Sequence, residues 1–403
     1  MSVTSTNDPV GVAISAVDGG EAVRLTQELV RIPSVVGEEG AIAEALYARM
    51  ATLGFDELRL QDALPGRPNV VGVVDSGRPG PTLVLTGHID TKPVCHGWDD
   101  DPYSGRLEDG RLHGHAVMDM KAGVGAFVEA AAALARVKER WAGKILVAAV
   151  ADHMGDQMGA IRFFEEYAGD YCILGELTDN TIYLGHRGRL YWDITSVGRA
   201  AHTCHRHDAV NAIAKMVPLI QEVEALRYMP DLPDWVAELF GAELFTAVGR
   251  IYGGLPPGGP SMIPDECTIR VDSRPHPGVE IDEVRALIDG AVARASAADP
   301  DARYEVVLAD VKAPHLIARD HDLTLALADG YRTVTGLEPR YSAGSWLADT
   351  ASFGQLIPTV IFGPGREPVY MPNEWLATED IEEAARVYAA TAAILLSGAQ
   401  TAV

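Results

Sequence analysis

Residues 82–90 read TLVLTGHID, and this stretch decides the fold. The apolar, β-branched run at 82–85 is typical of a strand that is buried on both faces. It leads directly into two polar residues, His88 and Asp90. Residues two apart on an extended segment share a face, so both side chains can point into one crevice. In open α/β sheets, such crevices at the carboxyl ends of strands hold the functional groups.

The same pattern continues along the first half of the chain. Residues 145–150 and 171–174 are two further short apolar runs, each predicted to be a buried strand. An alanine-rich segment at 122–137, between the first two runs, is predicted to be a helix. Strand, helix and strand in this order predict an α/β domain built in layers.

Polar residues stand at the ends of these elements. Asp119 precedes the predicted helix, His153 follows the second strand, and Glu176 follows the third. Taken alone, Asp119 is better explained as a helix N-cap than as a ligand. Taken together, the four strand and helix ends favour a metal centre, because imidazoles and carboxylates are ligands for zinc. No glycine-rich phosphate loop and no G-x-S-x-G motif competes for the site.

The pattern changes near His186. Residues 190–197 and 267–271 alternate as half-exposed strands do, whereas 211–226 and 280–297 have helical spacing. These segments predict a smaller α+β domain inserted into the first one. The predicted organisation is a first catalytic part at residues 1–186, an inserted domain at 187–310 and a second catalytic part at 311–403.

The charge of the chain excludes several classes of partner. Lys and Arg total 33 against 57 Asp and Glu, which gives a formal net charge of −24 over 403 residues. Nucleic acids and anionic membranes require a positive surface, so neither is an expected partner. No apolar run approaches the roughly 18 residues of a membrane span. Residues 1–20 lack the basic start of a secretory signal, so we expect a cytoplasmic protein.

Several motifs occur in the order found in one known family. The sequence resembles the zinc metallopeptidases and deacylases that include aminoacylases, acetylornithine deacetylase, succinyl-diaminopimelate desuccinylase and glutamate carboxypeptidase. The resemblance extends over nearly the whole chain. It rests on residues 86–91 (TGHIDT), 98–105 (WDDDPYSG), 119–123 (DMKAG), 198–202 (GRAAH), 211–213 (NAI), 263–265 (IPD), Arg274 and 363–365 (GPG).

The resemblance implies a fold and a zinc site. The fold is a zinc-binding catalytic domain with a layered mixed sheet, interrupted by an α+β lid that commonly mediates dimerisation. His88, Asp119 and Glu176 are implied to bind the first zinc, with Asp119 bridging to a second. Asp90 is implied to orient the imidazole of His88.

The resemblance also implies how a substrate is held. His202 matches a histidine that, in the family, reaches the substrate carbonyl oxygen from the lid of the partner subunit. Arg274 matches the lid arginine that grips a substrate carboxylate, a task suited to its planar fork of donors. We therefore expect a homodimer whose substrate is a small acylated amino acid with a free carboxylate.

Three positions depart from the family pattern. His153 stands where the family has its general-base glutamate, Met154 where a glutamate binds the second zinc, and Tyr370 where a histidine binds the second zinc. A thioether is a soft ligand ill suited to Zn²⁺, and a phenol must first lose a proton with a pKa near about 10. We therefore expect one zinc per chain, with the second site empty.

The departures leave the chemistry open. His153 is either a replacement base, since a free imidazole with a pKa of roughly 6.5 shuttles protons well, or a passive substitute in a decayed site. His113, His115 and Glu374 are candidates for rebuilding a second site. The leading hypothesis is a zinc-dependent amidohydrolase. The alternatives are the same pocket adapted to amide formation, acyl transfer, elimination or cyclisation, and a non-catalytic binding protein.

Overall fold

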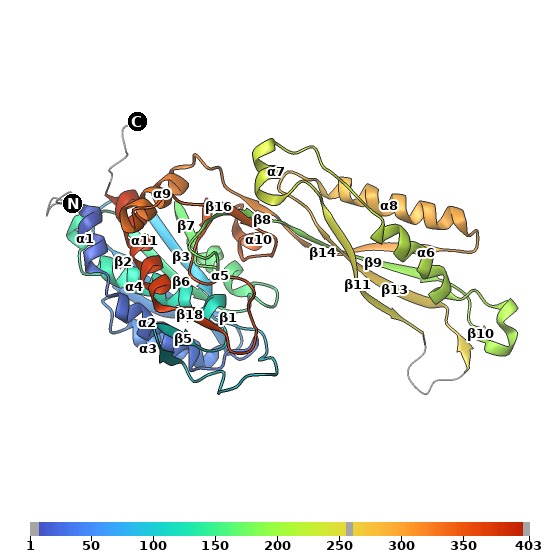
Figure 1. The fold of residues 1–403 in the computed structure, drawn as a ribbon, viewed down its shortest axis with the longest axis horizontal. Coiled ribbons are helices and arrows are strands. Elements are labelled where there is room, and N and C mark those ends of the chain that lie inside the picture. The colour runs from blue at the N-terminus through green and yellow to red at the C-terminus, as the bar shows by residue number, and fades with distance from the viewer. Residues whose placement is uncertain (1–7, 255–260, 398–403) are drawn as a thin grey trace. The chain divides into compact units, whose positions relative to one another are not determined.

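The computed structural model describes residues 8–254 and 261–397, and these form two compact units (Figure 1). The first unit comprises three stretches, Met1–Gly185, Leu316–Ser342 and Ala348–Val403. The second comprises His186–His315 together with Ala343–Leu347. The chain therefore passes into the second unit at His186, returns to the first at Leu316, and contributes a further short segment, Ala343–Leu347, to the second unit.

A mixed sheet forms the centre of the first unit. Its strands are β1 (Glu57–Leu64), β2 (Arg67–Asp75), β3 (Thr82–His88), β6 (Lys144–Val150), β7 (Tyr171–Leu174), β8 (Ile182–His186), β15 (His315–Leu316), β16 (Tyr341–Gly344) and β17 (Thr359–Ile361). Their order is β1-β2-β6-β3-β7-β17-β8-β15, and β16 pairs with β8. The four central strands β6, β3, β7 and β17 are parallel, whereas the pairs β1–β2, β2–β6 and β17–β8 are antiparallel. The predicted α/β class with a layered mixed sheet is confirmed.

Helices cover both faces of this sheet. They are α1 (Pro9–Ala16), α2 (Gly19–Val30), α3 (Gly40–Met50), α4 (Ala122–Ala135), α5 (Met158–Glu166), α9 (Asp322–Thr335), α10 (Thr350–Phe353) and α11 (Thr378–Leu396). On one face, Val84 and Leu146 pack against Phe163 of α5 and Phe353 of α10. On the other face, α4 lies against β3 and is enclosed by α2 and α11. Because successive side chains along a strand point to opposite faces, the buried strands pack against the helices on both sides of the sheet.

The beginning of α4 is fitted closely to the end of β7. Every residue from Ala122 to Leu134 is buried, and small alanines let this helix approach its neighbours. At Gly123, a Cβ would lie only 2.0 Å from the carbonyl oxygen of Gly175. Glycine is required there because any side chain would separate the two backbones. A short π-helical turn, η1 (Val117–Lys121), leads into α4 and carries Asp119.

A smaller sheet is attached to the first unit. It contains β4 (Arg106–Glu108), β5 (Arg111–His113) and β18 (Trp375–Ala377). A single 3₁₀ turn, η2 (Lys138–Arg140), precedes β6. Within residues 8–254 and 261–397, no helix is both long and apolar enough to cross a membrane.

The second unit is a four-stranded antiparallel sheet with helices on one face. Its elements are β9 (Arg189–Val197), β10 (Ala201–His202), η3 (Thr203–Asp208), α6 (Ala212–Glu224), α7 (Asp234–Phe240), β11 (Phe245–Gly253), β12 (Met262–Ile263), β13 (Glu266–Arg274), α8 (Ile281–Ala298) and β14 (Tyr304–Lys312). The order is β11-β13-β9-β14. Alternate residues of β9 and β13 are buried, and Trp192 and Ile269 pack with Leu219 of α6 and Ile288 of α8.

Candidate metal centre

The carboxyl ends of three parallel strands meet at one edge of the sheet. His88 at the end of β3 pairs with Val150 at the end of β6, and Thr86 pairs with Leu174 at the end of β7. The residues that follow β6 and β7 therefore emerge beside His88. This register places His88, His153 and Glu176 together although they are far apart in the sequence.

His88 is fully buried and faces acidic groups on both sides. Its Nδ1 lies 2.8 Å from the main-chain oxygen of Asp90, and its Nε2 lies 3.1 Å from Oδ1 of Asp119. The carboxylate of Asp90 is farther from Nδ1, at 3.8 Å. Asp90 therefore orients His88 through its main chain. Burial by itself lowers the pKa of His88, but the hydrogen bond to Asp119 and the neighbouring acidic charges raise it to about 10.

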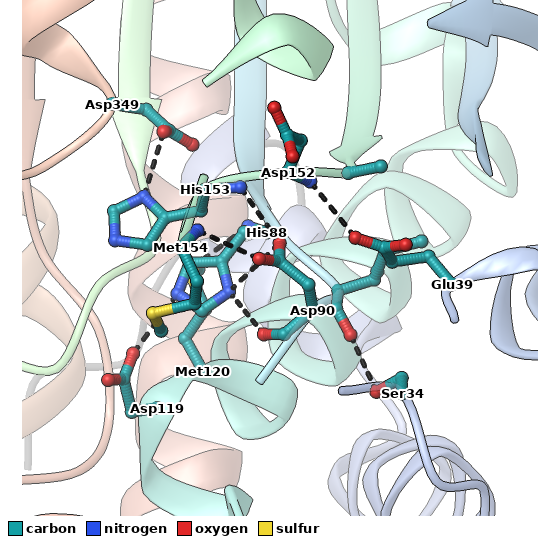
Figure 2. Close-up of polar contacts among 12 residues, drawn as sticks. Ser34, Glu39, His88, Asp90, Asp119, Met120, Asp152, His153, Met154 and Asp349 are labelled. Atoms are coloured by element: carbon teal, nitrogen blue, oxygen red, sulfur yellow. Dashed lines mark hydrogen bonds and ion pairs between the residues drawn. The ribbon is translucent and has the colours of Figure 1, made fainter. Parts of the chain in front are cut away.

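Asp90 uses its carboxylate for another task. Its Oδ1 accepts a hydrogen bond from the backbone N–H of His153 at 3.0 Å, and its Oδ2 accepts one from Met154 at 2.8 Å (Figure 2). Burial raises the pKa of this carboxyl group. These two hydrogen bonds connect the segment after β6 to the segment after β3. Asp90 therefore fixes the backbone position of His153.

His153 stacks on His88 and is held by a second acidic residue. The two imidazole rings are 4.2 Å apart at their centroids and 8° from parallel. Nδ1 of His153 lies 2.8 Å from Oδ1 of Asp349 (Figure 2). Burial lowers the pKa of His153, but the charge and hydrogen bond of Asp349 together with the charge of Glu176 raise the pKa overall. The contact with Asp349 thus fixes the Nδ1 side of the imidazole, and Nε2 is directed away from Asp349.

Sequence reasoning missed Asp349. This aspartate directly precedes α10, where its residue type indicates an N-cap. In the structure its side chain makes no cap hydrogen bond, is almost fully buried, and binds His153 instead. The one available signal was a charged residue within the otherwise uncharged stretch 341–363.

Glu176 completes the cluster. Its Oε1 lies 3.7 Å from Nε2 of His88 and 4.0 Å from Nε2 of His153, and it is buried without a hydrogen-bond partner. Burial, reinforced by Asp119, raises the pKa of Glu176 to about 7. A buried carboxylate oxygen with no partner is costly unless a cation or a donor occupies the space beside it.

Asp119 lies at the edge of this group. It does not cap α4: the N-cap is Lys121, and α4 has no side-chain cap hydrogen bond. The N-cap interpretation is therefore wrong, because η1 turns Asp119 toward His88 before the helix begins. Burial alone would raise the pKa of Asp119, but the hydrogen bond from His88 and the charges of His88 and His153 together lower it overall.

The residues present fit a divalent cation. The ligand atoms of His88, His153 and Glu176 all lie within 4.8 Å of one another, and no other group of three such ligands occurs in the described part of the chain. Carboxylate oxygens of Asp119 and Glu176 lie 3.1 Å and 3.7 Å from Nε2 of His88, and their charges favour a cation at this point. Nitrogen and carboxylate ligands in a buried, electronegative cluster suit zinc.

At the positions where the family resemblance places a second metal, the side chains make other contacts. Burial and the charge of Asp119 raise the pKa of the Tyr370 phenol far above its usual value, and its hydroxyl lies 3.4 Å from the main-chain oxygen of Asp119. The two carboxylate oxygens of Glu374 accept hydrogen bonds from the backbone N–H groups of Met118 and Tyr370. His115 directs Nε2 to the carbonyl of Lys92. Neither Glu374 nor His115 belongs to the metal-ligand group.

A second layer of charge supports the segment after β6. Arg67 donates to both carboxylate oxygens of Glu39, at 2.6 Å each, and to Oδ1 of Asp152 at 2.7 Å. Glu39 in turn accepts a hydrogen bond from the backbone N–H of Asp152 at 3.3 Å (Figure 2). Asp152 has a left-handed backbone, with a φ of 70°. The network fixes this turn directly before His153.

The two predicted substrate-binding residues lie in the second unit. His202 is exposed at the end of β10, and its Nδ1 accepts a hydrogen bond from the backbone N–H of Cys204. Arg274 ends β13 and forms an ion pair with Asp272 at 2.8 Å. Arg274 also lines a cavity of about 450 Å³ within this unit, beside Arg227 and Phe245. Their roles toward a substrate remain predictions.

The fold and the buried ligand cluster define a metal-dependent hydrolase of the α/β type. Residues 84–393 match the model of peptidase family M20/M25/M40, and the chain belongs to this family. The predicted membership in a zinc metallopeptidase and deacylase family is confirmed. The protein is therefore a metal-dependent enzyme of the peptidase and deacylase group.

Relatives over almost the full length agree with this assignment. Succinyl-diaminopimelate desuccinylase of Methylobacterium radiotolerans is 28% identical over 387 residues, covering 91% of this chain and 95% of the relative. The desuccinylase of Nitrosospira multiformis is 26% identical over 395 residues, covering 93% and 98%.

Solved structures share the fold. A tripeptidase from Staphylococcus aureus superposes with a TM-score of 0.75 at 18% identity, covering 94% of this chain and 99% of the other. An M20 family metallo-carboxypeptidase from Sulfolobus solfataricus gives 0.75 at 16% identity, covering 93% and 99%.

Proposed function

We propose that this protein is an amidohydrolase that uses one divalent cation, most simply Zn²⁺, to remove an acyl group from the nitrogen of a small amino acid. The observation that carries the proposal is the unpartnered, buried Oε1 of Glu176 beside Nε2 of His88 at the carboxyl ends of β3 and β7. Such an arrangement is stabilised by a cation bound between the two side chains.

The substrate class follows from the relatives and from the second unit. The desuccinylase relatives act, by name, on succinyl-diaminopimelate, which is an N-acylated amino acid. Arg274 supplies a planar fork of donors for a substrate carboxylate, and His202 supplies an imidazole for the acyl carbonyl oxygen. The proposed substrate is therefore an acylated amino acid with at least one free carboxylate.

The residues of the first unit have distinct roles. His88 and Glu176 would hold the ion, and Asp119 places a further carboxylate beside His88, outside the group of three ligand atoms. A divalent ion held there would polarise the acyl carbonyl and make water a better nucleophile. Asp90 keeps the segment after β6 in place, and Asp349 fixes the ring of His153.

One ion per chain is proposed because the second site has lost its ligands. Met154 and Tyr370 offer a thioether and a protonated phenol, and Asp119 alone cannot retain a second cation. Glu374, which follows Tyr370 closely, is fully engaged by backbone N–H groups.

A second candidate reaction uses the same pocket without hydrolysis. A histidine replaces the glutamate that the family uses as a base, and a two-metal clamp on water is missing. Weaker activation of water favours amide formation, acyl transfer or cyclisation, for which hydrolysis is the competing reaction.

Elemental analysis and a product screen together test the proposal. We expect about one zinc per chain after reconstitution, and free amino acid released from N-acyl substrates such as succinyl-diaminopimelate, detected by mass spectrometry. One zinc without hydrolysis, but with amide formed from an amine and an acyl donor, supports the second reaction. No bound metal in the reconstituted protein refutes both.

A further inference from the structure

His153 and His88 are arranged in the same way around Glu176. In each imidazole, Nδ1 contacts an oxygen acceptor at 2.8 Å, which is the main-chain oxygen of Asp90 for His88 and the carboxylate of Asp349 for His153. In each, Nε2 faces Oε1 of Glu176, at 3.7 Å and 4.0 Å. The two rings are nearly parallel.

The contact of Nδ1 with an oxygen acceptor determines which ring nitrogen carries the proton. A carbonyl or carboxylate oxygen cannot donate to Nδ1, so Nδ1 carries a proton, and in the neutral imidazole that a metal requires the lone pair lies on Nε2. A metal-binding histidine usually donates its Nδ1–H to a carboxylate and directs Nε2 at the cation. His153 and Asp349 form the histidine–carboxylate part of this arrangement, and Nε2 of His153 faces Glu176.

We infer that His153 is a ligand of the single metal ion, which is bound by His88, His153 and Glu176. This inference rests on the proposed function, because it needs the ion to be present. Two imidazoles and one carboxylate form a ligand set that zinc accepts in catalytic sites with an open position. The residue at the position of the family base thereby becomes part of the metal site.

The spacing of the ligand atoms supports this set. Zinc–ligand bonds of about 2.0–2.2 Å place tetrahedral ligand atoms roughly 3.3 Å apart. The distances from Glu176 Oε1 to the two Nε2 atoms exceed this value by less than 1 Å. A rotation of the His153 ring out of its stacking on His88 would bring Nε2 closer to Glu176 and let the two nitrogen lone pairs, nearly parallel in the stacked rings, converge on one ion.

The ligand set also explains how one ion is retained without a bridging partner. In the resemblance to the family, Asp119 ties the first ion to a second, and the second site adds its own ligands. Here the second site is lost at Met154 and Tyr370, while a nitrogen ligand is gained at His153. At the one remaining metal site, the nitrogen ligand gained at His153 compensates for the loss of the second metal.

The number of imidazoles bound to the ion tests the inference directly. X-ray absorption of the zinc-loaded protein, and nitrogen hyperfine structure in the electron paramagnetic resonance of the Cu²⁺-loaded protein, report this number. We expect two imidazoles in the wild-type protein and one in His153→Gln. The matched control His113→Gln changes a histidine outside the ligand group and is expected to retain two.

Metal affinity gives an independent measurement. Loss of an outer partner of a metal ligand costs about 10–100-fold in affinity, so we expect at least about 100-fold weaker zinc binding in His153→Gln and about 10-fold in Asp349→Asn. Competition with a chromophoric chelator measures both. Far-ultraviolet circular dichroism of the metal-free variants checks that they fold.

The outcomes separate the two proposals. One imidazole in the wild-type protein, with zinc affinity unchanged in His153→Gln, overturns the role of His153 as a ligand and leaves the metal-dependent function intact. Failure of the folded wild-type protein to bind zinc overturns the proposed function itself, and the ligand set with it.

Discussion

At the scale of single residues, Gly123 determines how closely Asp119 can approach Glu176. The backbone at the start of α4 lies against the carbonyl of Gly175, the residue that precedes Glu176. This contact joins the segment carrying one acidic group to the segment carrying the other. A methyl group at residue 123 would separate them, because the obstructing atom belongs to the backbone.

Gly123→Ala is expected to destabilise the protein by about 1–3 kcal/mol, since overpacking at a rigid contact forces backbone shifts. Urea unfolding followed by tryptophan fluorescence measures the change. Gly11→Ala is the control, because Gly11 lies in α1 where a Cβ meets only the Asp8 side chain at 3.4 Å. There the substitution is expected to be neutral or to stabilise by up to about 1 kcal/mol. Equal effects at both positions would contradict the role given to Gly123.

At the scale of elements, the turn after β6 is the best supported segment of the site. Arg67 from β2 and Glu39 before α3 hold Asp152, and Asp90 from the end of β3 holds the next two backbone N–H groups. Glu39 is fully buried, so Arg67 is needed to compensate its charge.

Arg67→Ala is expected to cost about 3–5 kcal/mol in the free energy of unfolding, because it leaves buried carboxylates uncompensated. Zinc affinity is expected to fall as well, since the turn positions His153. Arg59→Ala is the matched control: Arg59 pairs with Glu166 at the surface, where such pairs contribute about 1 kcal/mol or less. Chemical denaturation measures the free energy of unfolding of both variants. Similar losses of stability in the two would argue against a stabilising role of the buried network.

The second-metal positions give a gain-of-function prediction. His153→Glu, Met154→Glu and Tyr370→His together restore two carboxylates and an imidazole around Asp119. We expect two zinc ions per chain in elemental analysis and faster hydrolysis of an acylated amino acid. Each single variant is expected to retain one ion or fewer. A triple variant that still binds one ion or fewer would show that other features exclude the second metal.

The sequence predicted the buried centre of the sheet better than its edge. Residues 82–85, 145–150 and 171–174 are strands as expected, because burial on both faces leaves continuous apolar runs. Strand β1 (Glu57–Leu64) was missed, since it lies at an edge and exposes charged residues. The pairing of His153 with Asp349 could not be predicted, because their contact depends on the packing of α10 rather than on a local pattern.

At the scale of the whole molecule, the assembly expected from the family resemblance remains a prediction. The second unit exposes apolar side chains on β11, with Ile251 and Tyr252 each more than half exposed. We expect twice the chain mass in sedimentation equilibrium, and a monomer for Ile251→Glu with zinc content unchanged. A wild-type monomer at micromolar concentration would rule out the homodimer.

The insertion of the second unit has a consequence for how such proteins diversify. The chain leaves the large sheet after β8 and re-enters it at the neighbouring strand β15. Because departure and return are adjacent, the intervening module can be shortened, exchanged or grafted without rethreading the sheet. Evolution can thus remodel the second unit while leaving the ligand cluster of the first untouched, and a protein engineer can transplant that module between relatives.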